Sequence, residues 1–456
     1  MTKQQVSGNL RGKRVVVMGL GRFGGGVGVA RWLSRQGANV TVTDQEPREK
    51  LQSSIAQLAD FPITFQLGGH DPDILNSCDL LVVNPAVDKA RSEFFQRALN
   101  KHIAMTTEIN IFMQHCPAPI IGVTGSVGKS TTTAMIHLAI TAALKSSRSG
   151  RTCWLGGNIG QSLLANLEDI KPDDFVVLEL SSFMLEDLPW IRLSPHVAVV
   201  TNLAGNHLDR HGTLENYAAA KQNMLRFQHA DDWAILNGDD SIVRTWADVT
   251  AARVTYYHLE NKQDIELAVP GRHNQSNARA ALAVLQAVGL AAHTPAASTA
   301  LAQFPGLPHR LQLVHTSSSG VQWFNDSKAT TPEAAITALA ALEKKTFICI
   351  VGGYDKHADM TEFCRKLAHS AAAVLGIGAT GSALIAGTIA AGASREYAMY
   401  ADTLEGAVTC AKNWITKPNP GSKLFNSVLL SPGCASYDQF TNYEQRGEIF
   451  TALARQ

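Results

Sequence analysis

The sequence predicts an α/β protein of three domains, each built around a largely parallel sheet. Short apolar segments that end in glycine or polar residues recur along the chain, and helical patterns follow several of them. This alternation of strand, turn and helix is typical of parallel sheets covered by helices. With 456 residues, the chain is also too long for a single hydrophobic core.

The first predicted domain carries a glycine-rich turn directly after an apolar strand. The strand covers Arg14–Met18, the turn reads Gly19-Leu-Gly21-Arg-Phe-Gly24, and a helical pattern follows over 27–36. Asp44 ends the next predicted strand. This spacing fits the dinucleotide-binding fingerprint, in which an acidic residue meets a ribose hydroxyl, although a similar turn can cradle any nucleotide diphosphate. We therefore predict a Rossmann-like domain that binds a phosphorylated ligand.

The most informative stretch is the phosphate-binding loop predicted after the apolar strand 120–124. It reads Gly125-Ser-Val-Gly-Lys-Ser-Thr131 and runs into a helical pattern over 132–144. Backbone N–H groups and a helix N-terminus wrap polyphosphate in such loops, the lysine reaches the β/γ oxygens, and the hydroxyl can hold Mg²⁺. The strict pattern asks for glycine at Val123, so an ordinary glycine turn is the alternative interpretation.

Polar residues at the ends of later strands are further candidates. Glu179 lies at the end of the apolar strand 175–178, where phosphate-loop enzymes place an acidic Mg²⁺ ligand; a solvated strand-end glutamate is the alternative. His207 follows the strand 196–201, but a lone histidine there is more often structural. Lys221 lies in a helical pattern and, from the pattern alone, is an exposed helix lysine.

Two proline-bearing segments divide the chain, Cys116-Pro117-Ala-Pro119 and Phe304-Pro-Gly-Leu-Pro-His309. We predict domains over residues 1–117, 118–306 and 307–456, the second of P-loop ATPase type and the third again Rossmann-like. The remaining predicted strands are 39–43, 79–83, 233–237, 346–351, 373–377 and 427–430, and a further helical pattern covers 274–288.

Composition excludes several classes of protein. The chain has 40 Lys and Arg against 39 Asp and Glu, so bulk charge points neither to nucleic acid nor to an anionic membrane. Seven scattered cysteines without metal-finger spacing are typical of reduced thiols in a cytoplasmic protein. The N-terminal residues show no signal peptide, and no apolar run reaches the ~20 residues that span a membrane.

Together these motifs resemble the Mur ligase family, ATP-dependent enzymes that add amino acids to the UDP-linked peptidoglycan precursor. The short loop 125–130 is similar to that family's phosphate loop, and 157–160, 178–183 and 206–210 look like its central-domain signatures. Four more stretches resemble its D-glutamate-adding member. They are Leu307–Arg310, Asn325–Thr330, Gly352–Lys356 and Leu430–Phe440.

The resemblance implies a cytoplasmic ligase that joins D-glutamate to UDP-N-acetylmuramoyl-L-alanine through an acyl phosphate, using ATP and Mg²⁺. It implies that Lys129 holds the β/γ-phosphates, that Ser130 and Glu179 serve one Mg²⁺, and that His207 and Lys221 serve a second metal. Lys221 would then be N-carboxylated, which reverses the interpretation from its pattern. We expect a monomer, with no nucleic-acid partner and no membrane insertion.

The resemblance also assigns the other ligand contacts. Those for ATP are Gly125, Ser126, Val127, Gly128, Thr131, Asn274, Arg310 and Asp326; those for the UDP-substrate are Gly21, Arg22, Phe23, Asp44, Asn158 and Ser181. Those for glutamate are Lys328, Thr330, Lys356, Ser436 and Tyr443. A packed aromatic remains the alternative for Tyr443, and a turn residue the alternative for Asn158.

Three other functions remain open from the sequence. A dehydrogenase would use the first domain for NAD, but it leaves Lys129 and Glu179 without a role. A non-catalytic nucleotide-binding protein would not need Lys129, Glu179, His207 and Lys221 together. A ligase for L-glutamate or another diacid differs only in the acceptor, and the pocket residues do not decide the stereochemistry.

Overall fold

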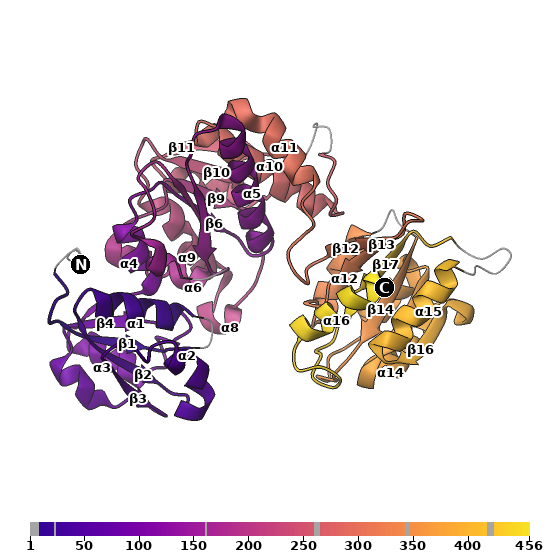
Figure 1. Cartoon of the computed structure of the whole chain (residues 1–456), viewed down its shortest axis with the longest axis horizontal. Helices are drawn as coiled ribbons and strands as arrows, with labels where there is room; N and C mark the ends of the chain where they lie inside the picture. Colours follow the sequence, from indigo (N-terminus) through magenta and orange to yellow (C-terminus); the bar gives the residue numbers. More distant parts are fainter. Residues whose placement is uncertain (1–8, 22–23, 160–161, 260–264, 343–345, 417–423) are drawn as a thin grey trace. The chain divides into compact units, whose positions relative to one another are not determined.

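The computed structural model describes residues 9–21, 24–159, 162–259, 265–342, 346–416 and 424–456. The chain forms two compact units (Figure 1). The first comprises Met1–Gln263 and Ser276–Leu301, and the second comprises Asp264–Gln275 and Ala302–Gln456. The first unit holds two sheets and the second unit holds one, so the chain contains three α/β domains.

The N-terminal sheet has the strand order β3-β2-β1-β4-β5, with parallel neighbours throughout. Its strands are β1 (Arg14–Met18), β2 (Asn39–Asp44), β3 (Ile63–Leu67), β4 (Leu80–Val83) and β5 (Ala104–Thr106). The helices of this domain are α1 (Gly25–Arg35), α2 (Gln52–Ala56), α3 (Glu93–Asn100) and α4 (Glu108–His115). This order is that of a Rossmann-like half, in which ligands bind beyond the carboxyl ends of the strands, where the order reverses.

The central sheet has the order β11-β10-β9-β6-β8-β7, again parallel. Its strands are β6 (Ile120–Thr124), β7 (Cys153–Gly157), β8 (Phe175–Glu179), β9 (Val197–Val200), β10 (Trp233–Asn237) and β11 (Arg253–Tyr257). The helices of this part are α5 (Lys129–Ser147), α6 (Ser182–Leu185), α7 (Leu188–Ile191), α8 (Leu208–His211), α9 (Leu214–Arg226), α10 (Arg272–Ala287) and α11 (Thr294–Ala302). The central strand β6 is buried along its whole length and leads directly into the phosphate loop.

The sheet of the second unit has the order β12-β13-β17-β14-β15-β16. Its strands are β12 (Gln312–Thr316), β13 (Gln322–Asn325), β14 (Phe347–Gly352), β15 (Ala373–Ile377), β16 (Ala398–Asp402) and β17 (Ser427–Leu430). The helices are α12 (Pro332–Ala341), α13 (Thr361–Ser370), α14 (Gly378–Ala390), α15 (Leu404–Thr416) and α16 (Tyr443–Arg455). The edge strand β12 is antiparallel to β13, whereas the other neighbouring pairs are parallel.

Apolar side chains explain how each unit holds together. In the first unit, one buried cluster runs from the N-terminal sheet through α4 into the central sheet. In the second unit, separate clusters fill the two faces of the sheet, with α14 packed on β14, β15 and β16, and α15 packed beside α16 (Figure 1). Burial of apolar surface is the main favourable contribution to folding, at about 25 cal/mol per Å².

The strongly apolar strands agree with their predictions, because runs such as Arg14–Met18 and Trp233–Asn237 form strands with those bounds. Other strands were not predicted, including β7 and the antiparallel pair β12 and β13. Two of the five residues of β7 are glycine, and three of the five residues of the edge strand β12 are polar. Both features hide the apolar run on which a strand prediction depends.

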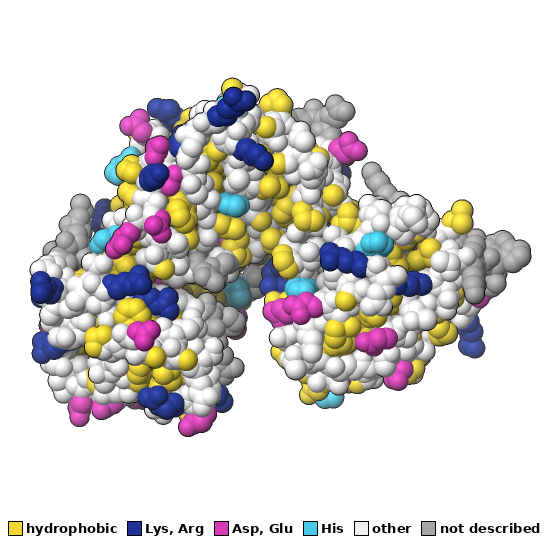
Figure 2. Space-filling model, in the orientation of Figure 1, with side chains coloured by type: hydrophobic (Ala, Val, Ile, Leu, Met, Phe, Trp, Pro, Cys, Tyr) yellow, Lys and Arg dark blue, Asp and Glu magenta, His cyan; other side chains and the backbone are white. Residues whose placement is uncertain are grey.

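The surface carries charges of both signs on each unit (Figure 2). The numbers of basic and acidic residues are nearly equal over the whole chain, 40 against 39. Among the helices that the structure describes, none is long and apolar enough to cross a lipid bilayer. The predicted domain boundaries at 117/118 and 306/307 lie in segments between the three sheets.

Candidate active site

The phosphate loop is a tight turn between β6 and α5. Gly125 has φ of 151°, and a Cβ at this position would lie 1.9 Å from Oγ1 of Thr201. Asn202 braces the loop, because its Oδ1 accepts from the N–H of Val127 at 2.9 Å and its carbonyl accepts from the N–H of Ser126 at 3.0 Å. Gly128, with φ of 83°, then caps the 19-residue helix α5. The positive end of this helix dipole therefore lies at the loop, as a polyphosphate site requires.

Lys129 is the first residue of α5, and its ammonium lies over the loop. Its Nζ donates to the carbonyls of Gly125 and Ser126 at 3.0 and 3.1 Å. Ser130 and Thr131 are half-buried in the same first helical turn, whereas Val127 exposes 63% of its surface. The structure thus brings the predicted phosphate-binding residues together on one turn, with a cation beside their N–H groups.

Glu179 ends β8, next to β6, and is 1% exposed. Its Oε1 accepts from Nδ2 of Asn158 at 2.8 Å. Its Oε2 is also buried, and within the described residues it has no hydrogen-bond partner. The alternative of a solvated strand-end glutamate is therefore wrong. A buried carboxylate oxygen without a partner is costly, which points to a ligand at this position.

Lys221 lies on the buried face of α9 and is 1% exposed. Its Nζ donates to the carbonyl of Gly125 at 2.8 Å and lies 4.5 Å from the centre of the Tyr217 ring. Burial lowers the pKa of this lysine to about 6, the charge of Lys129 acts in the same direction, and Glu179 opposes both. An amine with this pKa is largely neutral at pH 7 and therefore nucleophilic.

The interpretation of Lys221 as an exposed helix lysine is therefore wrong. The buried residues of α9 include Tyr217, Lys221, Met224 and Leu225, a spacing of i, i+4, i+7 and i+8. That spacing defines one face of a helix, so the apolar neighbours were the signal in the sequence that placed the lysine inside.

His207 precedes the one-turn helix α8 and has φ of 54° and ψ of 32°. This left-handed conformation is uncommon for a residue with a Cβ. Its ring centre lies 5.0 Å from that of Phe183 and 6.4 Å from that of Tyr217. Partial desolvation lowers the pKa of His207, and the charges of Lys129 and Lys221 lower it further. A neutral imidazole is a metal-ligating form of histidine.

The predicted metal ligands Ser130, Glu179, His207 and Lys221 include only two residues of the kinds that usually bind metals. In the described part of the chain, no cluster of three or more His, Cys, Asp or Glu side chains is placed to hold a metal ion. Lys129 and Glu179 nevertheless act electrostatically on Lys221, and Lys129 and Lys221 act on His207, so these groups share one neighbourhood. A cation here would need further oxygen ligands from a bound substrate or a modified side chain.

Two cavities adjoin the glycine-rich turn of the N-terminal domain. A cavity of about 540 Å³ is lined by Gly21, Asn158 and Ser181, and also by Phe183 and Arg210. The structure therefore brings three of the predicted UDP-substrate residues to one cavity. Sequence reasoning did not select Phe183 or Arg210 as site residues, although both belong to the stretches that carry the resemblance.

Asp44 lines the second cavity, of about 430 Å³. Its Oδ2 accepts from the N–H groups of Leu20 and Gly21 at 2.8 and 3.1 Å, and its Oδ1 accepts from the N–H of Glu46 at 2.9 Å. The carboxylate therefore fixes the shape of the glycine-rich turn. Arg22 and Phe23, which are also predicted to contact the substrate, lie outside the described residues.

In the second unit, Asp326 is 8% exposed and holds two neighbouring segments. Its Oδ1 accepts from the N–H of Leu311 at 3.0 Å, and its Oδ2 accepts from the hydroxyl of Ser431 at 2.8 Å. Burial raises the pKa of Asp326 to about 7, against the opposing effect of these hydrogen bonds. Arg310 is exposed near this carboxyl, and Asn274 is buried, with its Nδ2 donating to the carbonyl of Pro270 at 2.7 Å.

The predicted glutamate residues differ in exposure. Lys328 and Lys356 are exposed, Thr330 and Tyr443 are half-buried, and Ser436 is 2% exposed. The Lys328 ammonium lies 5.2 Å from the centre of the Tyr443 ring. Exposed ammonium groups of this kind are suited to bind the carboxylates of a small diacid.

Arg446 connects three of the segments that carry these residues, and sequence reasoning missed it. It is fully buried. Its guanidinium donates to the hydroxyl and carbonyl of Ser327, both at 2.9 Å, and to the carbonyls of Cys434 and Ala435 at 3.1 and 3.3 Å. The Ser327 hydroxyl in turn donates to the carbonyl of Tyr443 at 2.9 Å. Burial lowers the pKa of Arg446 to about 10.

Family models match all three domains in order. The Mur ligase MurD-like N-terminal domain matches residues 13–107, the Mur ligase middle domain matches 123–266, and the glutamate ligase domain of Mur ligases matches 309–432. The chain is 37% identical to UDP-N-acetylmuramoylalanine–D-glutamate ligase of Roseiflexus sp. strain RS-1, over 97% of this chain and 98% of that protein. It is 35% identical to the ligase of the same name from Pelotomaculum thermopropionicum, over 97% of each chain.

Solved structures share the fold. UDP-N-acetylmuramate–alanine ligase MurC of Thermotoga maritima has a TM-score of 0.58 at 21% identity, covering 97% of this chain and 99% of its own. MurF of Thermotoga maritima, solved in complex with ADP, has a TM-score of 0.53 at 16% identity, covering 91% of this chain and 95% of its own.

Proposed function

The chain belongs to the Mur ligase family, and we propose that it is the ATP-dependent ligase that adds D-glutamate to UDP-N-acetylmuramoyl-L-alanine. The observation that carries the proposal is the match to D-glutamate ligases over 97% of the chain. The grouping of Lys129, Glu179, His207 and Lys221 supports it, because a dehydrogenase or a non-catalytic scaffold gives these residues no role.

In the proposed reaction, the alanine carboxylate of the UDP-substrate attacks the γ-phosphorus of ATP. The bond to the β–γ bridging oxygen breaks, leaving ADP and an acyl phosphate. The amine of D-glutamate then attacks the acyl carbon, loses a proton, and phosphate departs. Because carboxylate and γ-phosphate are both anionic, the barrier is largely electrostatic. Lys129 would move from the loop carbonyls to the β/γ oxygens and offset part of that repulsion.

Mg²⁺ fits the central site on one observation, the buried Oε2 of Glu179 that lacks a hydrogen-bond partner within the described residues. Glu179 and Ser130 would hold this ion, with ATP oxygens as further ligands. His207 and a carboxylated Lys221 would hold a second one. When bound, Mg²⁺ would neutralise the charge that develops on the transferred phosphoryl group.

Carboxylation of Lys221 is part of the proposal. The neutral amine attacks the carbon of CO₂, and the proton released from nitrogen passes to water, so that a neutral amine becomes a carbamate anion. Burial favours this change, because the low pKa of Lys221 leaves the Nζ lone pair free at neutral pH. Because Nζ contacts the Gly125 carbonyl, a carboxylate formed on this nitrogen would lie close to the phosphate loop.

The other predicted contacts complete the proposal. The N–H groups and side chains of 125–131, with Asn274, Arg310 and Asp326, would bind ATP. Gly21, Asp44, Asn158 and Ser181, with Arg22 and Phe23, would serve the UDP-substrate. Lys328, Thr330, Lys356, Ser436 and Tyr443 would hold D-glutamate. We place this ATP-consuming reaction in the cytoplasm and expect a monomeric enzyme.

The test is phosphate release by the purified protein with Mg-ATP and UDP-N-acetylmuramoyl-L-alanine, across a panel of D- and L-amino acids. Release that needs the UDP-substrate and D-glutamate together is the expected result. Release with L-glutamate alone would keep the mechanism and change the acceptor. The absence of release with every acceptor, despite ATP binding, would contradict the proposed function.

A further inference from the structure

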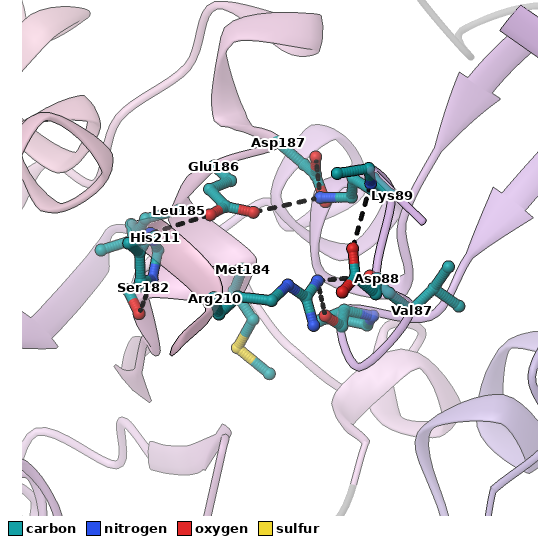
Figure 3. A network of polar contacts seen from close by, with 12 residues as sticks. Val87, Asp88, Lys89, Ser182, Met184, Leu185, Glu186, Asp187, Arg210 and His211 are labelled. Carbon is teal, nitrogen blue, oxygen red and sulfur yellow. Dashed lines mark hydrogen bonds and ion pairs between the residues drawn. The ribbon is translucent and has the colours of Figure 1, made fainter. Parts of the chain in front are cut away.

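A series of polar contacts joins the segment after β4 to the helix that follows His207 (Figure 3). We call it the polar bridge and define it as Lys89, Ser182, Glu186, Asp187 and His211. It begins at Lys89, whose Nζ lies 2.6 and 2.7 Å from the two carboxylate oxygens of Asp187 and 3.5 Å from Oε2 of Glu186. The N-terminal domain thus meets the central domain through a three-membered ion cluster.

The first half of the polar bridge is shielded from water. The side chain of Asp187 is 2% exposed and that of Lys89 is 16% exposed. The ammonium also lies 5.4 Å from the centre of the Trp190 ring, and the Asp187 carbonyl accepts from Nδ2 of Asn110 at 2.8 Å. Loss of one partner from such a pair leaves a buried charge uncompensated, so the geometry is strongly fixed.

The second half orients His211. Its Nδ1 lies 3.1 Å from Oε1 of Glu186, and its Nε2 lies 3.0 Å from the hydroxyl of Ser182. The ring also stacks on Phe183, with 5.4 Å between the ring centres. Since both nitrogens have partners, the imidazole cannot turn without losing a contact.

Helix α8 carries this constraint to His207. The N–H of His211 donates to the carbonyl of His207 at 2.9 Å, so the two residues are the ends of one hydrogen-bonded turn. On the same turn, the Arg210 guanidinium donates to the carbonyls of Pro85, Ala86 and Val87. Pro85, Ala86 and Arg210 all line the 540 Å³ cavity that is proposed for the UDP-substrate.

We propose that Lys89 is a positioning residue, which acts through Glu186 and His211 to set the place of His207 relative to the segment 85–89. The inference rests on the proposed function, because it takes His207 as part of the reaction centre. Lys89 itself does not line the substrate cavity. Substitution of Lys89 should therefore lower turnover more than it weakens ATP binding, because the phosphate loop binds ATP in the proposed function.

The experiment compares Lys89→Met, Lys89→Arg and the control Lys101→Met in the phosphate-release assay. Lys101 is an exposed lysine of the same domain, whose Nζ donates to Oδ1 of Asn76. Lys89→Met is expected to lower kcat about tenfold, as small displacements of catalytic groups do, with KM for ATP within about twofold of wild type. Lys89→Arg, which keeps the cation, should restore most of kcat, and Lys101→Met should match wild type.

A double variant separates positioning from folding. Lys89→Met alone leaves Asp187 without its cation, so the buried carboxyl must either keep an uncompensated charge or take up a proton, because burial raises its pKa. Lys89→Met with Asp187→Asn makes this position neutral. Thermal unfolding of the double variant should return towards that of wild type, while its kcat stays low because Glu186, which orients His211, still lacks the Lys89 ammonium. Recovery of kcat in the double variant, or unchanged kcat in Lys89→Met, would overturn the positioning role of Lys89 and leave the proposed function unaffected. A wild-type protein without ligase activity would overturn the proposed function and this inference with it.

Discussion

Single residues carry the chemistry of this protein, and Lys221 is the one whose environment departs furthest from that of an ordinary lysine. Its side chain is buried against Tyr217, and its pKa is about 6. We predict that Lys221→Ala lowers turnover more than about a hundredfold, since the proposed second metal site would lose its proposed anionic ligand. Added formate or acetate should restore part of the activity in the phosphate-release assay.

The control for this variant is Lys145→Ala, which removes an exposed lysine in the last turn of α5. It should keep wild-type turnover with or without added carboxylate. Full activity in Lys221→Ala would show that carboxylation of this lysine has no part in the reaction.

Asp326 predicts a pH dependence of stability. Its pKa is about 7 in the folded chain against 3.8 in a model peptide, so between about pH 4 and 7 only the folded state keeps the proton. Stability therefore falls as pH rises through this window, because the folded state must either hold that proton or bury a charge. Asp326→Asn removes the contribution. We predict that this variant gains stability relative to wild type from pH 4.5 to 7.5, by on the order of 1–4 kcal/mol.

Urea unfolding of both proteins at the two pH values measures this change. Asp60→Asn, at an exposed position, serves as the matched control and should follow wild type at both pH values. An equal stability difference between wild type and Asp326→Asn at pH 4.5 and 7.5 would contradict the prediction.

At the scale of elements, the end of β7 fixes the place of Glu179. Gly157 has φ of 90°, and a Cβ there would lie 2.3 Å from the backbone oxygen of Glu179 on the neighbouring strand. Gly157→Ala therefore must displace β8 where the proposed metal ligand lies. We predict a loss of about 2–3 kcal/mol in stability, with reduced phosphate release.

Gly150 offers a matched control, because it also has a positive φ, 71°, yet a Cβ there would meet no heavy atom within 4 Å. Gly150→Ala should lose only the small cost of the backbone conformation. If denaturant unfolding gave the two alanine variants the same stability, the contact with β8 would not be the cause of the stability loss in Gly157→Ala.

Helix α16 supplies a second organising element through Arg446. The guanidinium donates to the carbonyls of Ser327 and Cys434, which precede Lys328 and Ser436 in the chain. It therefore holds the two segments that carry these proposed glutamate-binding residues. We predict that Arg446→Met raises KM for D-glutamate more than KM for ATP and lowers stability by about 2–3 kcal/mol, since buried carbonyls lose their donors. Arg446→Lys should restore little, because an ammonium cannot reproduce the planar fork.

Arg455→Met is the control on the same helix, where the guanidinium is exposed and donates to the carbonyl of Val314. Its KM values should remain those of wild type. Equal rises in both KM values for Arg446→Met would indicate general damage to the second unit rather than to the acceptor site.

The sequence was most informative where local rules decide the structure. The phosphate loop follows from its glycines and lysine, and the strands around it follow from apolar runs. The spacing of apolar residues on α9 could have predicted the burial of Lys221. The role of Arg446 depends on contacts between segments far apart in the chain, which no local pattern specifies. Asp44 matched the dinucleotide-binding fingerprint, in which the acidic residue meets a ribose hydroxyl. In the structure, its carboxylate accepts from N–H groups of the glycine-rich turn.

At the scale of the whole molecule, the proposed ATP contacts belong to both compact units. Residues 125–131 are in the first unit, whereas Asn274, Arg310 and Asp326 are in the second. If one nucleotide uses both sets, substrate binding must fix the two units relative to each other. We predict a lower radius of gyration by X-ray scattering with the non-hydrolysable analogue AMP-PNP, Mg²⁺ and UDP-substrate than without ligands.

Lys129→Ala is the control for this measurement, because it weakens the nucleotide site without altering the linking segments. Its radius of gyration should change less under the same conditions. An unchanged radius for wild type at saturating ligand would show that the two units do not close on the nucleotide.

The backbone of His207 has an evolutionary consequence. A side chain in the left-handed conformation costs about 1–2 kcal/mol that glycine would not incur, and His207 keeps that conformation at φ of 54°. Selection for stability alone would favour glycine or asparagine at this position, so the proposed function gives the imidazole a reason to be retained. A duplicated gene copy that is no longer selected for ligase activity should lose this histidine early. The residue at this position would then distinguish active paralogues from inactive ones.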